Sequence, residues 1–168
     1  REPYVDLVQS RNQRSWIRRL RCSAHNLEIE KMRWSSVPVA DRCCSVCHSG
    51  DIGDEFYFAM KCSVFNTKRA CFIGKMTSIL PGFNLLTSED QFKTMLCPSV
   101  SAACKVTNQF LRIMFVARDK LAEGVNMSEL TYPTLPVPNL NDSFDTMSDV
   151  GDEWDQFISE SDTSLQNL

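Results

Sequence analysis

The sequence predicts a mainly α-helical fold: a small helical domain around an irregular cysteine knuckle, followed by a disordered C-terminal tail. Apolar residues recur at helical spacing over residues 100–121, three cysteines gather between residues 44 and 62, and the composition changes abruptly after Gly124. We therefore expect a helical domain at 1–124 with its knuckle at 42–62, a proline-rich linker at 125–141 and an acidic disordered tail at 142–168.

The first stretch of the domain, residues 4–31, has a helical pattern. Its apolar residues fall roughly on one side at helical spacing, and Ser23 is expected to cap a second short helix. Basic residues cover much of the remainder, and they are candidate contacts to nucleic-acid phosphates. They are Arg11, Arg14, Arg18, Arg19 and Arg21.

The knuckle contains a CxxC pair, Cys44 and Cys47, and Cys62 follows fifteen residues later. A CxxC turn presents two thiolates at the angle that tetrahedral zinc requires, but zinc needs four ligands. Tyr57 lies where a histidine would be expected, and its phenol stays protonated near neutral pH. The candidates for a fourth ligand are His48, Cys43 and Cys71, and the residues alone leave zinc binding open.

Beyond the CxxC pair, residues 55–60 (EFYFAM) fit either a short strand or the start of a helix. Pro81-Gly82 indicates a turn, and Ser88 with Gln91 forms a capping box at the start of a helix. A further helix is expected to begin near Ser99, to bury its Phe- and Met-rich face in the core and to end at Gly124.

Charge divides the chain into a basic body and an acidic tail. Residues 1–125 hold all 18 Lys and Arg and 12 acidic residues, whereas residues 126–168 hold nine acidic residues and no Lys or Arg. A basic body is compatible with nucleic-acid binding or with a merely solvated surface. The tail places Trp154, Phe157 and Ile158 at helical spacing within acidic surroundings, as in segments that fold into a partner's groove.

The eight cysteines show no even framework, which favours a reducing, intracellular compartment and metal binding over disulfides. The longest apolar run, 113–117, is too short to span a membrane. We expect a monomer, and the first residue, Arg1, suggests a fragment of a longer protein. No catalytic motif is evident, and His25 and His48 lack convincing acid–base partners, so we expect no enzymatic activity.

The ordered combination of LRCSAHNLEIEKMRW, RCCSVCHSGDIGDEFYFAMKC, FNLLTSEDQF and the last amphipathic helix resembles a known family over roughly residues 14–122. It is similar to the zinc-knuckle region after the polymerase domain of non-LTR (LINE-type) retrotransposon reverse transcriptases. The resemblance implies Cys44, Cys47 and Cys62 as zinc ligands, places Tyr57 on the family's histidine, and implies a poorly ordered basic stretch before the closing helix. The polymerase Asp-Asp block is absent from this chain.

These observations support three functional hypotheses. The first is a non-catalytic module that binds RNA or single-stranded DNA, with the arginines on phosphates and Phe56, Tyr57 and Phe58 stacking on bases. The second is a protein-interaction element that acts through the acidic aromatic tail. The third is a degenerate retroelement relic with no selected activity.

Overall fold

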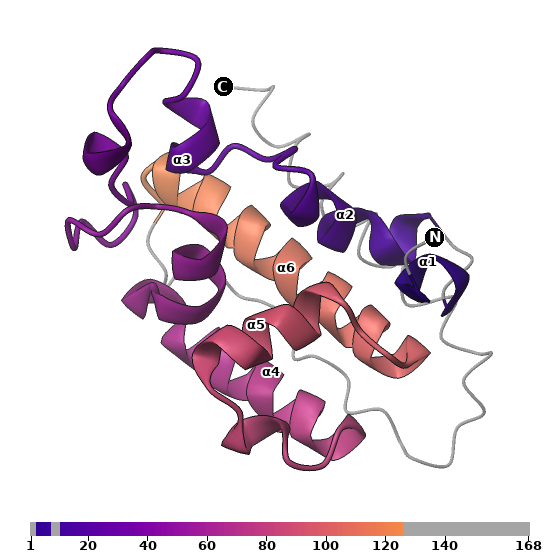
Figure 1. Cartoon of the computed structure of the whole chain (residues 1–168). Helices are drawn as coiled ribbons and strands as arrows, with labels where there is room; N and C mark the ends of the chain where they lie inside the picture. The colour runs from indigo at the N-terminus through magenta and orange to yellow at the C-terminus, as the bar shows by residue number, and fades with distance from the viewer. Residues whose placement is uncertain (1–2, 8–10, 126–168) are drawn as a thin grey trace, which may run out of the picture. The chain divides into compact units, whose positions relative to one another are not determined.

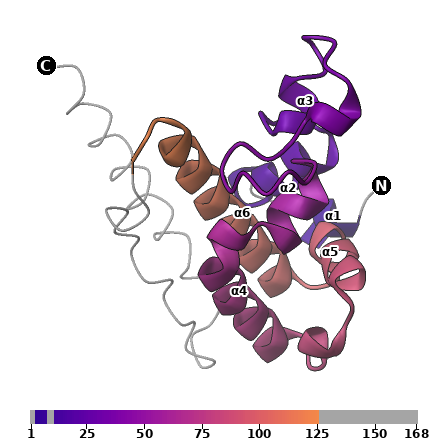
Figure 2. The same cartoon turned by 90° about the vertical axis from the view of Figure 1, so that its left-hand side faces the viewer.

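Helix α6 (Ser101–Ala122) runs through the middle of the described domain in the computed structural model, with α2 along one side and α4 along another (Figure 1, Figure 2). The structure describes residues 3–7 and 11–125, all within the first of two units, Arg1–Leu130 and Thr131–Leu168. The described residues contain no strand, and a single isolated bridge joins Cys43 to Ile52, so the mainly helical prediction is confirmed.

Most elements follow one another with short connections, and a longer one, residues 42–56, carries Cys44 and Cys47. In chain order they are α1 (Pro3–Leu7), η1 (Asn12–Arg14), α2 (Ser15–Arg21), α3 (Glu28–Lys31), η2 (Val39–Asp41), the π-helical turn η3 (Tyr57–Lys61), η4 (Ser63–Phe65), α4 (Asn66–Ile79), η5 (Phe83–Leu85), α5 (Ser88–Leu96) and α6. None of the described helices is both long and apolar enough to cross a lipid bilayer.

The face of α6 that the apolar spacing predicted is buried, because residues three and four apart line one side of a helix. Gly124 lies just past the last turn with φ +90°, a left-handed conformation that favours glycine, and so ends the helix as expected. The start differs slightly: Val100 is the extended cap residue and 38% of it is exposed, so it lies outside the buried face.

The N-terminal stretch is broken into short helices. Ser23 adopts φ +50° and ends the run after α2, so the prediction that it caps the next helix is wrong. The residue that caps α3 is Leu27, which has no capping side chain. The Ser23 hydroxyl donates instead to Glu55 Oε1 at 3.1 Å.

Aromatic rings from η3, η4, α4 and α6 fill the core. Phe58 lies edge-on to Phe65 at 5.4 Å and against Phe115 at 4.7 Å between ring centroids. Phe72 stacks on Phe110 at 4.2 Å. Residues 55–61 are helical rather than extended, which settles the ambiguity of that segment. Helix α4 occupies the stretch for which the family resemblance implied poor order.

The cap residue of helix α5 lies one position before Ser88, the cap expected from sequence. Thr87 is the cap residue, and its hydroxyl oxygen accepts from the Asp90 backbone N–H at 3.2 Å. Gln91 is buried and donates from Nε2 to the Phe83 carbonyl at 3.1 Å, so it ties α5 to η5 and does not cap the helix.

Candidate metal centre

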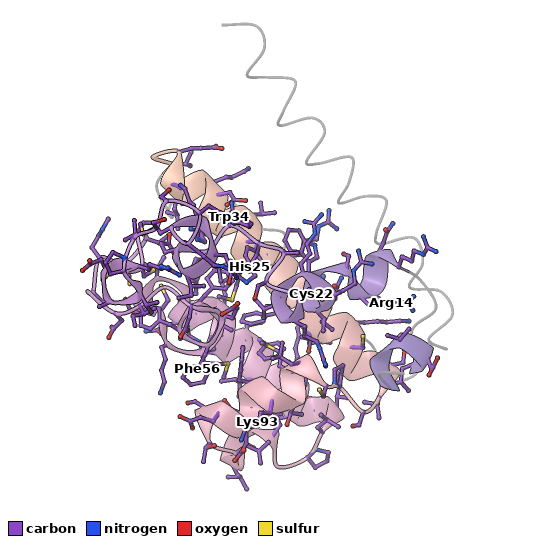
Figure 3. All side chains as sticks on the ribbon, turned by 45° about the horizontal axis from the view of Figure 1, so that its top comes forward. Arg14, Cys22, His25, Trp34, Phe56 and Lys93 are labelled. Atoms are coloured by element: carbon purple, nitrogen blue, oxygen red, sulfur yellow. The ribbon has the colours of Figure 1, made fainter. Side chains whose placement is uncertain are left out.

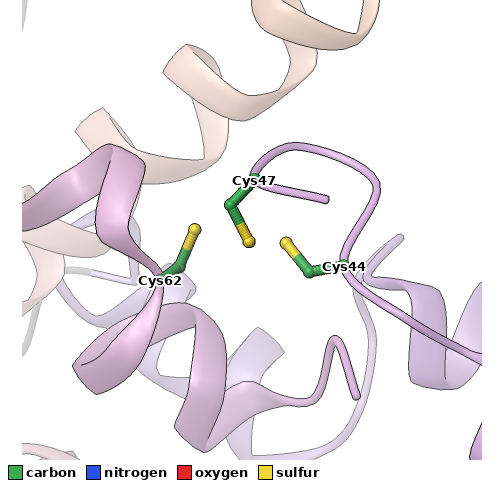
Figure 4. Close-up of side chains that lie close together, drawn as sticks. All are labelled: Cys44, Cys47 and Cys62. Carbon is green, nitrogen blue, oxygen red and sulfur yellow. The ribbon is translucent and has the colours of Figure 1, made fainter. Parts of the chain in front are cut away.

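Cys44, Cys47 and Cys62 bring their sulfur atoms together, all within 4.8 Å of one another (Figure 4). Cys44 and Cys62 are buried, whereas Cys47 is partly exposed. No further His, Cys, Asp or Glu ligand atom among the described residues joins the group. Three thiol sulfurs at this spacing can hold a metal ion, since thiolates are strong ligands for soft and borderline metals.

Cys44 and Cys47 lie in a narrow loop that the antiparallel bridge between Cys43 and Ile52 closes. Arg42 immediately precedes this loop, and its guanidinium donates to two backbone carbonyls of the preceding segment. The acceptors are the carbonyls of Val37, at 2.9 Å, and Ile29, at 2.8 Å. The arginine therefore anchors the base of the ligand loop to α3.

Cys62 follows the π-helical turn. The Cys62 backbone N–H donates to the Tyr57 carbonyl at 2.8 Å and so closes the wide hydrogen-bonded ring of that turn. Such turns are uncommon and occur frequently at functional sites. Arg69 of α4 is buried and donates to the carbonyls of Ala59, at 2.9 Å, and Cys62, at 2.8 Å. An arginine thus fixes each of the two segments that carry the ligands: the partly buried Arg42 for the loop and the buried Arg69 for the turn.

The cluster favours a thiolate. A hydrogen bond from Cys62 and backbone N–H groups of Cys47 and Val46 lower the pKa of Cys44 to about 5, although burial opposes the shift. The same interaction with Cys44, together with burial, raises the pKa of Cys62. The two sulfurs therefore share one proton, and a metal ion would replace that proton because metal ligands bind as thiolates.

Tyr57 lies at the exposed edge of the cluster. Its hydroxyl is 3.1 Å from Cys47 Sγ and 2.6 Å from Ser49 Oγ. Burial and the hydrogen bond with Cys47 raise the pKa of the Tyr57 phenol, so the group is neutral and acts as a hydrogen-bond partner of the sulfur. The residue at the expected histidine position is thus beside the three cysteines, but with different chemistry.

The structure does not bring the three proposed replacement ligands into the cluster. His48 is exposed at a φ of +53° in the turn after Cys47. The Cys43 thiol is 3.2 Å from the Gly50 carbonyl oxygen, to which it donates. Cys71 is exposed on α4.

A buried ion pair joins α3 to the closing helix α6, and sequence reasoning missed it. Glu28 Oε1 accepts from Arg118 NH2 and from the Ser45 hydroxyl, each at 2.5 Å. Burial alone would raise the pKa of Glu28, but the Ser45 hydrogen bond and the Arg118 charge outweigh it and lower that pKa. Gly53 packs so closely that an added Cβ would lie 2.6 Å from Glu28 Oε2 and 3.1 Å from the Cys44 Cα.

His25 does have an acid–base partner, contrary to the expectation from sequence. Its Nε2 lies 2.9 Å from Glu55 Oε1, and the His25 side chain is 1% exposed. Nδ1 accepts from the Leu27 backbone N–H at 3.4 Å. With both ring nitrogens engaged, the imidazole connects the loop before α3 to the turn that precedes Cys62, which is a structural role.

The five candidate arginines divide into two groups. Arg14 donates to the Val5 carbonyl at 2.8 Å, and Arg21 donates to the Leu96 carbonyl at 2.9 Å, so both hold helices together. The exposed members of the set are Arg11, Arg18 and Arg19. A nucleic acid can reach Arg18 and Arg19, defined here as the arginine face of α2, and also Arg11, which precedes η1.

The aromatic candidates are mostly unsuited to base stacking. Phe58 is 2% exposed within the core, so the prediction that it stacks on bases is wrong: it cannot do so without leaving that core. Phe56 is half-buried and packs edge-on against Phe92 at 5.5 Å. Trp34, which sequence reasoning did not single out, is 83% exposed, and the Arg33 guanidinium lies 5.8 Å from its ring centroid. Figure 3 shows Trp34 well apart from Phe56.

A shallow pocket of about 440 Å³ adjoins the arginine face of α2. Trp16 stacks on Phe115 at 5.2 Å in its wall, and the Arg19 guanidinium lies 4.6 Å over the Trp16 ring. Asn26 donates to Asp119 Oδ1 at 3.1 Å and both line the pocket, so aromatic and hydrogen-bonding groups border the same space.

Trp154, Phe157 and Ile158, the linker and the acidic tail lie outside the described residues, so the structure says nothing of them. Comparison with known proteins gives no further assignment. No family model, no curated protein and no solved structure matches the chain.

Proposed function

We propose that the chain is a zinc-stabilised, non-catalytic module that binds single-stranded RNA or DNA, of the kind that follows the polymerase in non-LTR retrotransposon reverse transcriptases. The observation that carries the proposal is the arginine face of α2 beside an aromatic pocket. The cysteine cluster supplies the stability of the knuckle.

Zinc fits the donor set that Cys44, Cys47 and Cys62 offer. All three ligand atoms are sulfur, and the backbone N–H groups around Cys44 hydrogen-bond to its thiolate form. Zinc binds thiolates without redox chemistry and suits an irregular loop, because it has no strong geometric preference beyond a tetrahedron. Bound there, it would hold the loop, the π-helical turn and α4 together.

The arginine face suits a flexible, single-stranded ligand. Arg18 and Arg19 are exposed on consecutive positions of α2 and can contact neighbouring phosphates. Trp16 is partly exposed and lines the pocket next to these charges, and Asn26 and Asp119 offer hydrogen-bonding groups for a base edge. Proteins that bind unpaired strands combine these two elements, a basic surface and an aromatic platform.

Fluorescence anisotropy of a labelled single-stranded RNA, titrated with the full chain at several salt concentrations, tests the proposal. The logarithm of the affinity should fall linearly with the logarithm of the salt concentration, by about 0.7 per phosphate contact. Arg18→Gln should weaken binding and reduce that slope by about 0.7. Lys93→Gln is the matched control, since Lys93 is also exposed but lies on α5.

Two results would contradict the proposal. One is a wild-type chain without salt-dependent affinity for RNA or single-stranded DNA. The other is an equal effect of Arg18→Gln and Lys93→Gln, because that would reflect net charge and not a defined face of the molecule.

A further inference from the structure

The three-cysteine cluster is one donor short of a complete zinc site. Structural zinc is almost always four-coordinate, whereas sites that exchange a ligand keep three protein donors and an open position. Among the described residues, Cys44, Cys47 and Cys62 form a group that no fourth His, Cys, Asp or Glu atom joins. The composition of the site is therefore that of an open one.

Two hydroxyls border the cluster beside Cys47. Tyr57 Oη and Ser49 Oγ lie 2.6 Å apart, and Tyr57 Oη is 3.1 Å from Cys47 Sγ, so the phenol is already engaged in local hydrogen bonds. A neutral hydroxyl is a weak zinc ligand beside thiolate or imidazole.

Access to this side is from solvent. Ser49 is exposed, and Cys47 and Tyr57 are partly exposed, whereas Cys44 and Cys62 close the site from within. Three thiolates and one divalent zinc ion leave a net charge of −1. A neutral nitrogen donor adds no further negative charge, whereas a fourth thiolate would add one in a half-buried site.

We propose that the Cys44, Cys47 and Cys62 site has an open fourth coordination position that binds a small imidazole ligand in place of water. The inference rests on the metal binding of the proposed function but not on its nucleic-acid binding. The exchange breaks one metal–oxygen bond, forms one metal–nitrogen bond and moves no electrons.

Cobalt(II) in place of zinc makes the fourth ligand visible, because the absorption of cobalt depends on its ligands. The full chain is loaded with one cobalt and titrated with imidazole, and native mass spectrometry checks that the metal stays bound. We expect the wild-type spectrum to shift along a saturating curve that ends at one imidazole per cobalt. Tyr57→His should start near the end of that curve and change little, since its own imidazole fills the position. Tyr57→Phe and Ser49→Ala should still shift, since neither hydroxyl is among the metal ligands.

An unchanged wild-type spectrum overturns the inference, and so does an equal shift in Tyr57→His. A wild-type chain that holds no cobalt overturns the inference and the metal site together. A chain that holds cobalt, ignores imidazole and still binds RNA overturns only the open position. A chain that holds cobalt and responds to imidazole but does not bind RNA leaves this inference standing and refutes the nucleic-acid half of the proposed function.

Discussion

The ion pair between Glu28 and Arg118 should control the stability of the whole domain. The Arg118 and Glu28 side chains are 5% and 3% exposed, and they join segments 90 residues apart in sequence. Arg118→Met leaves the Glu28 carboxylate buried with Ser45 as its remaining side-chain partner. Removal of one member of a buried pair costs about 3–5 kcal/mol, because the other charge loses its compensation.

Urea unfolding of the metal-loaded chain measures this cost. Arg118→Met should lower the free energy of unfolding by about 3–5 kcal/mol, and the double variant with Glu28→Gln should lose less than the sum of the two single variants. Lys93→Met, at a side chain that is 76% exposed, is the control and should change it by less than about 0.5 kcal/mol. A cost below about 1 kcal/mol for Arg118→Met, or strict additivity, would refute the reasoning.

Three further predictions concern the core, a helix cap and acid stability. Phe58→Ala should cost about 3–5 kcal/mol of unfolding free energy and Phe56→Ala clearly less; equal costs in urea unfolding would contradict the assignment of Phe58 to the core. Thr87→Ala should cost about 1 kcal/mol and Ser88→Ala less than about 0.5, and the reverse order would restore the capping box expected from sequence. Because the folded-state pKa of Glu28 is lowered, its contribution is present above its ordinary pKa of about 4.3 and is lost as the pH falls through the folded value. The urea midpoint of the wild type should fall between pH 7 and pH 3, and it should fall less steeply in Glu28→Gln. An equally steep fall in both proteins would exclude Glu28 as a source of the pH dependence.

The long helix and the cysteine group were accessible from sequence because each depends on local spacing. Residues three and four apart along α6 define its buried face whatever packs against it. The CxxC turn and the short distance in sequence to Cys62 likewise favour a group in which the three sulfur atoms lie close together. Helix α4 was not predicted because its sequence shows no amphipathic pattern. Its buried residues are few, and one of them, Arg69, is charged, whereas Phe72 and Met76 are apolar.

Partners that depend on distant contacts could not be found in this way. Nothing local to Glu28 indicates that Arg118 lies beside it, and nothing local to His25 indicates Glu55. The prediction of the α5 cap residue was wrong for another reason. Thr87 and Ser88 are both good cap residues, and sequence spacing cannot choose between them once the side chain that would complete the box is diverted to the carbonyl of Phe83.

The metal content of the purified full chain tests the central claim most directly. Native mass spectrometry after loading with zinc and removal of excess metal should find one zinc per chain in the wild type. Cys43→Ser should retain it, because that thiol donates to a backbone carbonyl, whereas Cys44→Ser and Cys62→Ser should lose it. A wild-type chain without zinc, or equal loss in Cys43→Ser and Cys44→Ser, would contradict the account.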